Sequence, residues 1–449
     1  MENRLFSRIL RQITRNQRFI YHLASTYALL GVNMVTMFFL TPMLIRHLGN
    51  EGYGIWMLLF GITNFFNLSS FGFGQTFTLE LIKKQQKPGD VNRLVNTLLF
   101  SLVFFACATF PIFLVVHFNL GVFRISEAYL PVASRSLWLI YLVFFLNFLS
   151  QLPANILFAR HKLGLRNAIE IGKVIVNFSL TIWVVQSGGN IARLSAITVL
   201  VTLLYLIVLF WFSRIHLDFE LNFKYYSKKL FRKFLKPSLH FFMLGLAMQI
   251  IVYSDSILVS SLKSPALVAA YSIALRIPDV TMRLIFKITD VKIPKIPMLY
   301  DKQAWLELWH LHNRLFWLTF GVAGSIVLIL LVFGRFIIQL WMGSDFELNQ
   351  TLLLIFTLNM FSQCLFHIPA VFLQSLGMHE RASILSMIGA PISIGMAWWF
   401  SKSFGLEGIA LAMCGTQFGV GLFVIPQFYI FIKEKLQLKN RQMNLFQLK

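Results

Sequence analysis

The stretch ALVAAYSIALRIPDVTMRLIFKITD, Ala266 to Asp290, is apolar over most of its length but contains three basic residues and an internal aspartate. At about 100° per residue, Arg276, Arg283 and Lys287 fall within roughly 20° of one line, and Asp279 lies about 60° to one side. A charge that faces lipid costs several kcal/mol, so such a stripe is expected to face protein or a water-filled cavity. The stretch therefore predicts a membrane helix whose charged face lines an internal site.

The composition of the whole chain agrees with a membrane protein. Of its 449 residues, 57% are hydrophobic and only 13% are charged, and the mean hydropathy is +0.70, which excludes an ordinary soluble domain. The formal net charge of +22 comes from short basic clusters between apolar runs rather than from one basic face. Membrane topology explains this charge better than nucleic-acid binding, and no nucleic-acid partner is expected.

The sequence contains no pattern of metal ligands and no signature of a resident cofactor. Its three cysteines, Cys107, Cys364 and Cys414, lie within apolar runs and lack metal-ligand spacing. We interpret them as buried packing residues. There is also no P-loop, nucleophile elbow or CxxC pair, so neither a metal nor a cofactor is expected.

Twelve segments have the length and apolar character of membrane spans, each with about 20 mostly apolar residues. Their approximate limits are Phe19–Ile45, Tyr53–Leu79, Leu94–Phe118, Val132–Phe158, Asn167–Gln186, Leu194–Phe212, Pro237–Leu262, Ala266–Asp290, Leu315–Leu340, Thr351–Leu376, Ala382–Phe400 and Leu406–Ile432. Lysine and arginine gather in alternate connections, starting with five arginines in the first 18 residues. Because such residues stay on the cytoplasmic side, both termini are predicted to be cytoplasmic.

The longest polar connection divides these spans into two groups of six, and weak self-similarity supports the division. Leu-Pro-Ala at 152–154 recurs as Ile-Pro-Ala at 368–370, and Tyr53-Gly-Ile recurs as Tyr271-Ser-Ile, at offsets of 216 and 218 residues. A nearly constant offset indicates two parallel repeats. The predicted fold is an all-α integral membrane protein with about 12 transmembrane helices in two six-helix lobes around a central cavity. The expected parts are a basic amphipathic segment (1–18), an N-terminal lobe (19–213), a cytoplasmic linker (214–236), a C-terminal lobe (237–432) and a cytoplasmic tail (433–449).

Several short sequences resemble bacterial polysaccharide flippases, the O-antigen and exopolysaccharide transporters of the multidrug, oligosaccharidyl-lipid and polysaccharide exporter superfamily. They are LGNEGYGIW at 48–56, FGFG at 71–74, Asp255 within YSDS, and Tyr271 followed by Arg276. The resemblance implies a V-shaped pair of lobes with a cationic cavity, alternating access, and coupling to an H⁺ or Na⁺ gradient or to the membrane potential. The implied substrate is undecaprenyl-pyrophosphate-linked oligosaccharide, moved across the bacterial inner membrane. The implied partners are membrane lipids, a polysaccharide polymerase and a chain-length regulator.

The basic residues suit that substrate class. A lipid-linked pyrophosphate carries two or more negative charges, and arginine offers a fixed fork of donors for phosphate oxygens. Arg276 lies about ten residues into its span, roughly 15 Å deep, and is predicted to be the primary pyrophosphate contact. Arg283 and Lys287 would form a cationic track from the cytoplasmic entrance, or would instead snorkel to the interface. Lys173, in the fifth span, would let the N-terminal lobe supply a second cation.

The acids of the C-terminal lobe admit two roles. Asp255 and Arg276 are expected at depths that differ by about one helical turn, so a pair is geometrically plausible. Asp255 or Asp279 could therefore form a structural salt bridge with Arg276, which is the alternative to pyrophosphate binding. Asp255 could instead bind the proton or sodium ion that couples transport, and the sequence leaves this choice open.

Three other functions compete with an oligosaccharide flippase. A multidrug cation antiporter would want unpaired acids in its cavity, whereas the charges of the eighth span are mostly basic. A flippase for a peptidoglycan lipid precursor fits the same chemistry and stays open. A membrane polysaccharide polymerase or glycosyltransferase would be expected to show a large catalytic loop, and the external connections are short. The sequence therefore favours a transporter over an enzyme.

Overall fold

The computed structural model describes most of the chain. The described residues are 2–67, 74, 77–78, 80–81, 88–235, 246, 249–250, 254–290, 292–293, 295–344, 346–376, 378 and 380–447. The chain forms two compact units, Met1–Met243 and Leu244–Lys449. Part of the second predicted span, most of the FGFG sequence and the beginning of the seventh predicted span lie outside the described residues.

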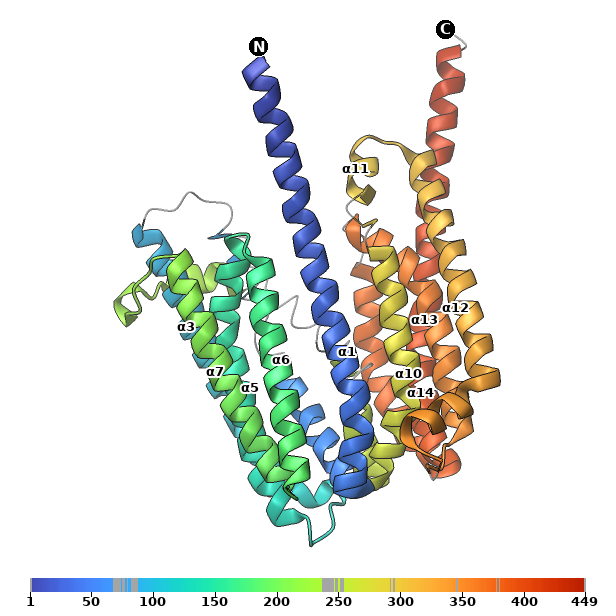
Figure 1. Cartoon of the computed structure of the whole chain (residues 1–449). Helices are drawn as coiled ribbons and strands as arrows, with labels where there is room; N and C mark the ends of the chain where they lie inside the picture. The colour runs from blue at the N-terminus through green and yellow to red at the C-terminus, as the bar shows by residue number, and fades with distance from the viewer. Residues whose placement is uncertain are drawn as a thin grey trace. The chain divides into compact units, whose positions relative to one another are not determined.

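Nearly all of the described chain is helical, and it contains no β-strand. The N-terminal unit contains α1 (Glu2–Asn67), α3 (Pro88–Ala108), α4 (Phe110–Phe118), η2 (Leu120–Phe123), α5 (Leu130–Ala159), α6 (Leu163–Gln186), α7 (Ile191–His216) and η3 (Phe223–Tyr225). The C-terminal unit contains α9 (Asp255–Leu262), α10 (Pro265–Asp290), α11 (Lys295–Asp301), α12 (Trp305–Met342), α13 (Gln350–Ser375) and α14 (Glu380–Gln447) (Figure 1).

The prediction of an all-α membrane protein is confirmed. Eight helices in the described part of the chain are long and apolar enough to cross a membrane. Two of them, in α1 and α14, each correspond to two predicted spans, so the eight helices account for ten of the twelve. Helix α9 is the described end of the seventh predicted span. Helix α10 is the eighth span and has 26 residues, but its charged residues make it less apolar than the others.

Two glycines explain why single helices contain two predicted spans. Gly49 interrupts α1 with φ 72° and ψ 172°, and Gly405 interrupts α14 with φ 62° and ψ −131°. A positive φ strains residues that have a Cβ, whereas glycine adopts it without penalty. Each glycine therefore marks the sharp turn between two neighbouring predicted spans.

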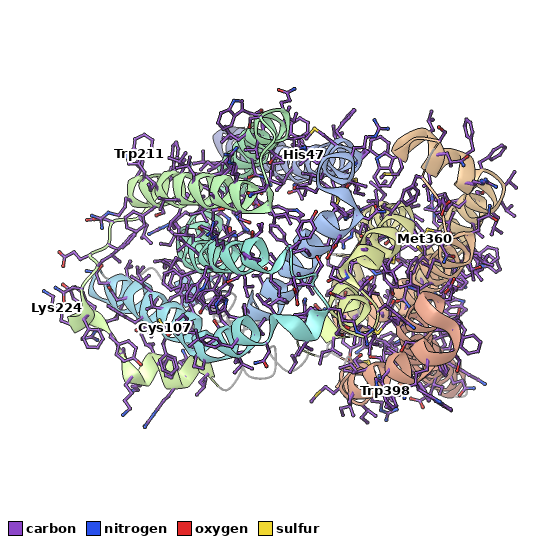
Figure 2. The ribbon with its side chains drawn as sticks, turned by 90° about the horizontal axis from the view of Figure 1, so that it is seen from below. His47, Cys107, Trp211, Lys224, Met360 and Trp398 are labelled. Atoms are coloured by element: carbon purple, nitrogen blue, oxygen red, sulfur yellow. The ribbon has the colours of Figure 1, made fainter. Side chains whose placement is uncertain are left out.

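Helix α5 is the central element of the N-terminal unit, where it packs against α1, α3, α6 and α7. Its buried contacts with α7 include Ala154, Leu157, Tyr205 and Leu209. The far side of α7 is apolar and exposed, and Figure 2 shows Trp211 projecting from the edge of this unit. Exposed tryptophan on a membrane helix is consistent with a lipid-facing surface.

Helix α13 has the corresponding place in the C-terminal unit, where it packs against α10, α12 and α14. Met360 and Cys364 of α13 are buried with Ile285 of α10 and Ala323 of α12. Of the three cysteines interpreted as buried, Cys364 is buried and Cys414 is partly buried, but Cys107 is exposed. The interpretation is wrong for Cys107 because an apolar run in a membrane helix includes a lipid-facing side as well as a packed side.

The connection after α7 folds back onto α3. Asn96 donates to the Glu220 carbonyl at 2.6 Å and accepts from the Asn222 N–H at 2.9 Å. The Glu220 N–H in turn donates to Asn92 at 2.9 Å. The Asn96 side chain is fully buried, and its amide hydrogen-bonds the backbone at residues 220 and 222, which holds this connection against α3. The first half of the expected linker is therefore an ordered part of the N-terminal unit.

Candidate functional site

The charged stripe consists of Arg276, Asp279, Arg283 and Lys287 on α10. The helix is continuous from Pro265 to Asp290, so spacings of three and four residues place all four side chains along one face. The opposite side of the helix is apolar and packed, with Ala274 and Ile285 buried. The amphipathic pattern therefore fixes which side of α10 packs and which side presents charge.

Within the charged stripe, the acid is paired with the basic residue one turn further along. Arg283 Nε lies 3.0 Å from Asp279 Oδ2, and about half of the Arg283 side chain is exposed. Arg276 is partly buried and its Nε is fully enclosed, while Lys287 is partly buried. Three basic residues and one acid leave the stripe with a net charge of +2.

Asp255 is the first residue of α9 and lies beside Tyr271 of α10. The Asp255 carboxyl lies near the Tyr271 hydroxyl and within electrostatic range of Asp279. Among the described residues, neither Asp255 Oδ1 nor the Tyr271 hydroxyl forms a hydrogen bond that meets strict geometric criteria. The Tyr271 ring is almost fully buried and packs edge-on against Phe356 at 5.0 Å. The predicted pairing of Asp255 with Arg276 stays a prediction.

Lys173 lines a polar cavity of about 320 Å³ that lies within the N-terminal unit. Its Nζ donates to Asn147 Oδ1 at 2.8 Å and sits 4.4 Å from the centre of the Tyr205 ring. We call this cavity the amide pocket. Its lining residues are Gly74, Asn147, Ser150, Gln151, Ala154, Asn155, Arg166, Glu170, Lys173 and Tyr205.

The amide pocket is built from helical spacing. Its α5 residues are 147, 150, 151, 154 and 155, which form one face of that helix, and its α6 residues Arg166, Glu170 and Lys173 follow each other by four and three residues. Sequence reasoning singled out Lys173 but missed Asn147, Gln151 and Asn155. The available signal was the spacing of these three amides, four residues apart within a membrane span.

The C-terminal unit carries a similar polar row on α13, formed by Asn359, Gln363 and His367. Asn359 donates to Gln417 of α14 at 3.1 Å, and the His367 ring stacks on Phe286 of α10 with centroids 3.8 Å apart. Gln363 and His367 follow Asn147 and Gln151 by 216 residues, the offset of the Pro-Ala sequences. The two units therefore place polar side chains at equivalent positions of equivalent helices.

Comparison with solved structures identifies the fold. The chain matches a structure described as the inward-facing conformation of a multidrug resistance MATE family transporter of the MOP superfamily, with a TM-score of 0.77 and 12% identity over 90% of this chain and 96% of that chain. It also matches a MOP superfamily transporter from Pyrococcus furiosus, with a TM-score of 0.61 and 13% identity over 92% and 95% of the two chains. The fold is therefore that of a multi-pass MOP superfamily transporter.

Sequence comparison identifies the family. The profile of the polysaccharide biosynthesis protein family matches residues 17–300, and the chain belongs to this family. A Shigella flexneri protein described as "Putative O-antigen transporter" is 20% identical over 385 residues, which cover 82% of this chain and 88% of that protein. The expected resemblance is thus confirmed at the level of the family.

Proposed function

We propose that this protein is a flippase that moves undecaprenyl-pyrophosphate-linked oligosaccharide units across the bacterial inner membrane by alternating access. The products would serve O-antigen, capsule or exopolysaccharide synthesis. The observation that carries the proposal is the charged stripe of α10, with its net charge of +2 inside a transporter fold. The family and the O-antigen transporter relative support the same substrate class.

Arg276 is the primary pyrophosphate contact in this proposal. Its partial burial reduces competition from water, which strengthens a charge-assisted hydrogen bond to a phosphate oxygen. The Nε of Arg283 already faces Asp279, so Arg283 and Lys287 act as a cationic track that a phosphate group follows to Arg276. Lys173 is the cation that the N-terminal unit contributes to the same substrate.

Asp255 is the coupling residue in this proposal. As a carboxylate near Tyr271 and within electrostatic range of Asp279, it would take up H⁺ or Na⁺ from a transmembrane gradient. Uptake of the ion would neutralise negative charge beside the stripe, and the stripe would then attract a pyrophosphate more strongly. The protein would do this as a transporter without catalytic residues, with both termini in the cytoplasm.

A cation antiporter is the second candidate, because Asp255 and Asp279 lie close enough to influence each other. Such a site would bind an organic cation directly and would need no basic residue. A flippase for a peptidoglycan lipid precursor shares the pyrophosphate chemistry and differs only in the sugar that it accepts.

Reconstituted transport tests the proposal. The full chain is placed in liposomes that contain a fluorescent undecaprenyl-pyrophosphate oligosaccharide, and a membrane-impermeant quencher reports arrival at the outer leaflet. The proposal expects quenching that exceeds that of protein-free liposomes and that falls to background in Arg276→Ala. Transport of a cationic dye with no movement of the lipid-linked sugar would establish the antiporter instead. Equal transport of a peptidoglycan lipid precursor and the oligosaccharide would show that the sugar does not select the substrate.

A further inference from the structure

The amide pocket has the size and chemistry of a small-molecule site. Its volume of about 320 Å³ lies at the lower end of the roughly 300–1,000 Å³ that such sites occupy. Three side-chain amides, Asn147, Gln151 and Asn155, share its α5 face, and Arg166, Glu170 and Lys173 share its α6 face. The pocket is therefore polar on two adjacent helices of the N-terminal unit.

The amides of this pocket suit hydroxyl groups. A side-chain amide presents both an acceptor oxygen and a donor NH₂ group, and a hydroxyl group is likewise both donor and acceptor. Phosphate oxygens at neutral pH are acceptors, so the amide oxygens and the Glu170 carboxylate would face them unfavourably. The pocket has a net charge of only +1, because it contains two basic residues, Arg166 and Lys173, and one acid, Glu170. The lining therefore favours a polyhydroxylated ligand over a pyrophosphate.

Lys173 fixes the direction in which the first amide points. Because an ammonium group can only donate, its 2.8 Å contact identifies the oxygen of Asn147 and leaves that amide's NH₂ group directed elsewhere. The Tyr205 ring holds the other side of the ammonium group. Arg166 contributes a buried Nε that has no hydrogen-bond partner among the described residues. The pocket thus contains one oriented amide and one buried donor before any ligand binds.

Gly74 keeps the pocket open on its remaining side. A Cβ at this position would collide with the Asn155 amide and would also approach the Gln151 oxygen at 3.7 Å. Both amides border the pocket, so a larger residue at position 74 would displace the Asn155 amide and touch the Gln151 amide. Glycine therefore preserves the space that a ligand would occupy.

We propose that the amide pocket is a saccharide subsite, which holds one sugar unit of the lipid-linked substrate by its hydroxyl groups. This inference rests on the proposed function and adds to it a division of labour. The charged stripe of α10 binds the pyrophosphate, and the amide pocket selects the sugar. Lys173 acts on the sugar end of the substrate, both through Asn147 and as a donor to sugar hydroxyl or carboxylate oxygens.

Binding measurements on the full chain in lipid nanodiscs separate the two ends of the substrate. The probes are farnesyl pyrophosphate and the same molecule carrying glucose, galactose or N-acetylglucosamine. The variants are Gln151→Ala/Asn155→Ala, Gly74→Ala and Arg276→Ala. Asn119→Ala, an exposed amide outside the pocket that bonds its own segment, is the matched control. Gly74→Ala keeps every amide and narrows the space, so it serves if the double variant fails to fold.

Wild-type protein should bind at least one glycosylated probe roughly tenfold or more tightly than bare farnesyl pyrophosphate, as two or more added hydrogen bonds would give. The double variant and Gly74→Ala should lose this preference, keep their affinity for the bare probe, and differ from Asn119→Ala. Two outcomes would overturn the saccharide subsite and leave the proposed function standing. In the first, the wild-type protein binds the bare probe and shows no preference for a glycosylated one. In the second, the preference for a glycosylated probe survives both pocket variants. A wild-type protein that binds no farnesyl pyrophosphate of any kind overturns the proposed function and the subsite with it.

Discussion

Arg283 Nε and Asp279 Oδ2 are 3.0 Å apart on successive turns of α10, so the acid of the charged stripe faces the arginine that follows it along the helix. This pairing divides the stripe into a neutral pair and two further cations, Arg276 and Lys287. A pyrophosphate that approaches Arg283 must compete with a carboxylate for the guanidinium group. Arg276 and Asp279 are separated by only three residues, so the same carboxylate is also a neighbour of Arg276 on the helix surface.

Replacement of Arg276 distinguishes ligand binding from structural pairing. Arg276→Ala should abolish transport and leave membrane insertion intact, because it removes a charge from the bilayer rather than adding one. Arg276→Lys should retain partial activity, because lysine keeps the positive charge but lacks the paired donors of the guanidinium group. Surface polysaccharide in a flippase-deficient strain is the measurement. Restored export in Arg276→Ala combined with Asp255→Asn or Asp279→Asn would show that an orphaned acid, rather than a missing ligand, caused the defect.

Neutralising Asp279 should strengthen anion binding. Asp279→Asn releases Arg283 and raises the net charge of the stripe from +2 to +3, so affinity for bare farnesyl pyrophosphate should rise by roughly two- to tenfold. Thermal stability should change little, because a partly exposed pair at this spacing contributes only about 0.3–0.5 kcal/mol. Titration in nanodiscs at low and high salt checks both points. Weaker binding in Asp279→Asn would contradict the attraction between stripe and substrate.

Asp255 and Tyr271 offer a test of coupling. If Asp255 carries the coupling ion, Asp255→Asn should stay folded and lose its response to an imposed H⁺ or Na⁺ gradient. Tyr271→Phe keeps the packed ring and removes only the hydroxyl, so it should shift the ion dependence and preserve transport itself. Liposome transport with and without each gradient is the measurement. A loss of thermal stability in Asp255→Asn, with an unchanged gradient response, would assign a structural role.

The pocket charges should show coupled effects on stability. Lys173→Met removes one of the two cations that line the partly enclosed cavity with Glu170, and should lower the free energy of unfolding by about 1–2 kcal/mol. The double variant Lys173→Met/Glu170→Gln should recover most of that loss. Thermal unfolding in detergent compares the two variants with Glu170→Gln alone. Additive losses in the double variant would show that the two charges do not interact.

The contact between the linker and α3 should limit how readily a protease cleaves the linker. Asn96→Ala removes two partly buried hydrogen bonds to the backbone at residues 220 and 222, at a cost of about 1–3 kcal/mol. Trypsin should then cleave faster after Lys228 and Lys229 in inverted membrane vesicles. Asn119→Ala is again the control. Cleavage in right-side-out vesicles instead would contradict a cytoplasmic linker.

The sequence predicted the elements that depend on local pattern. Apolar runs located the membrane helices, and the periodicity of α10 placed Arg276 and Arg283 on one face of the helix. It could not choose the partner of Asp279, because Arg276 and Arg283 are both within reach on that face. The choice depends on side-chain directions that the spacing leaves free.

The amide pocket was harder to predict for a different reason. Single amides in membrane helices usually bond neighbouring helices, so Asn147, Gln151 and Asn155 carried little meaning one by one. Their role depends on how α5 is rotated against α6 and on the space that Gly74 leaves between Asn155 and its surroundings. Both are properties of packing between distant segments.

The fold-back of residues 220–227 onto α3 has a consequence for biosynthesis. All the partners in this contact, from Asn92 to Ser227, have been translated before the first residue of α9 leaves the ribosome. Domains commonly fold as units during synthesis, the N-terminal one first. The N-terminal half can therefore complete this contact while the charged helix α10 has yet to be made, and that helix enters the membrane after the N-terminal unit has folded.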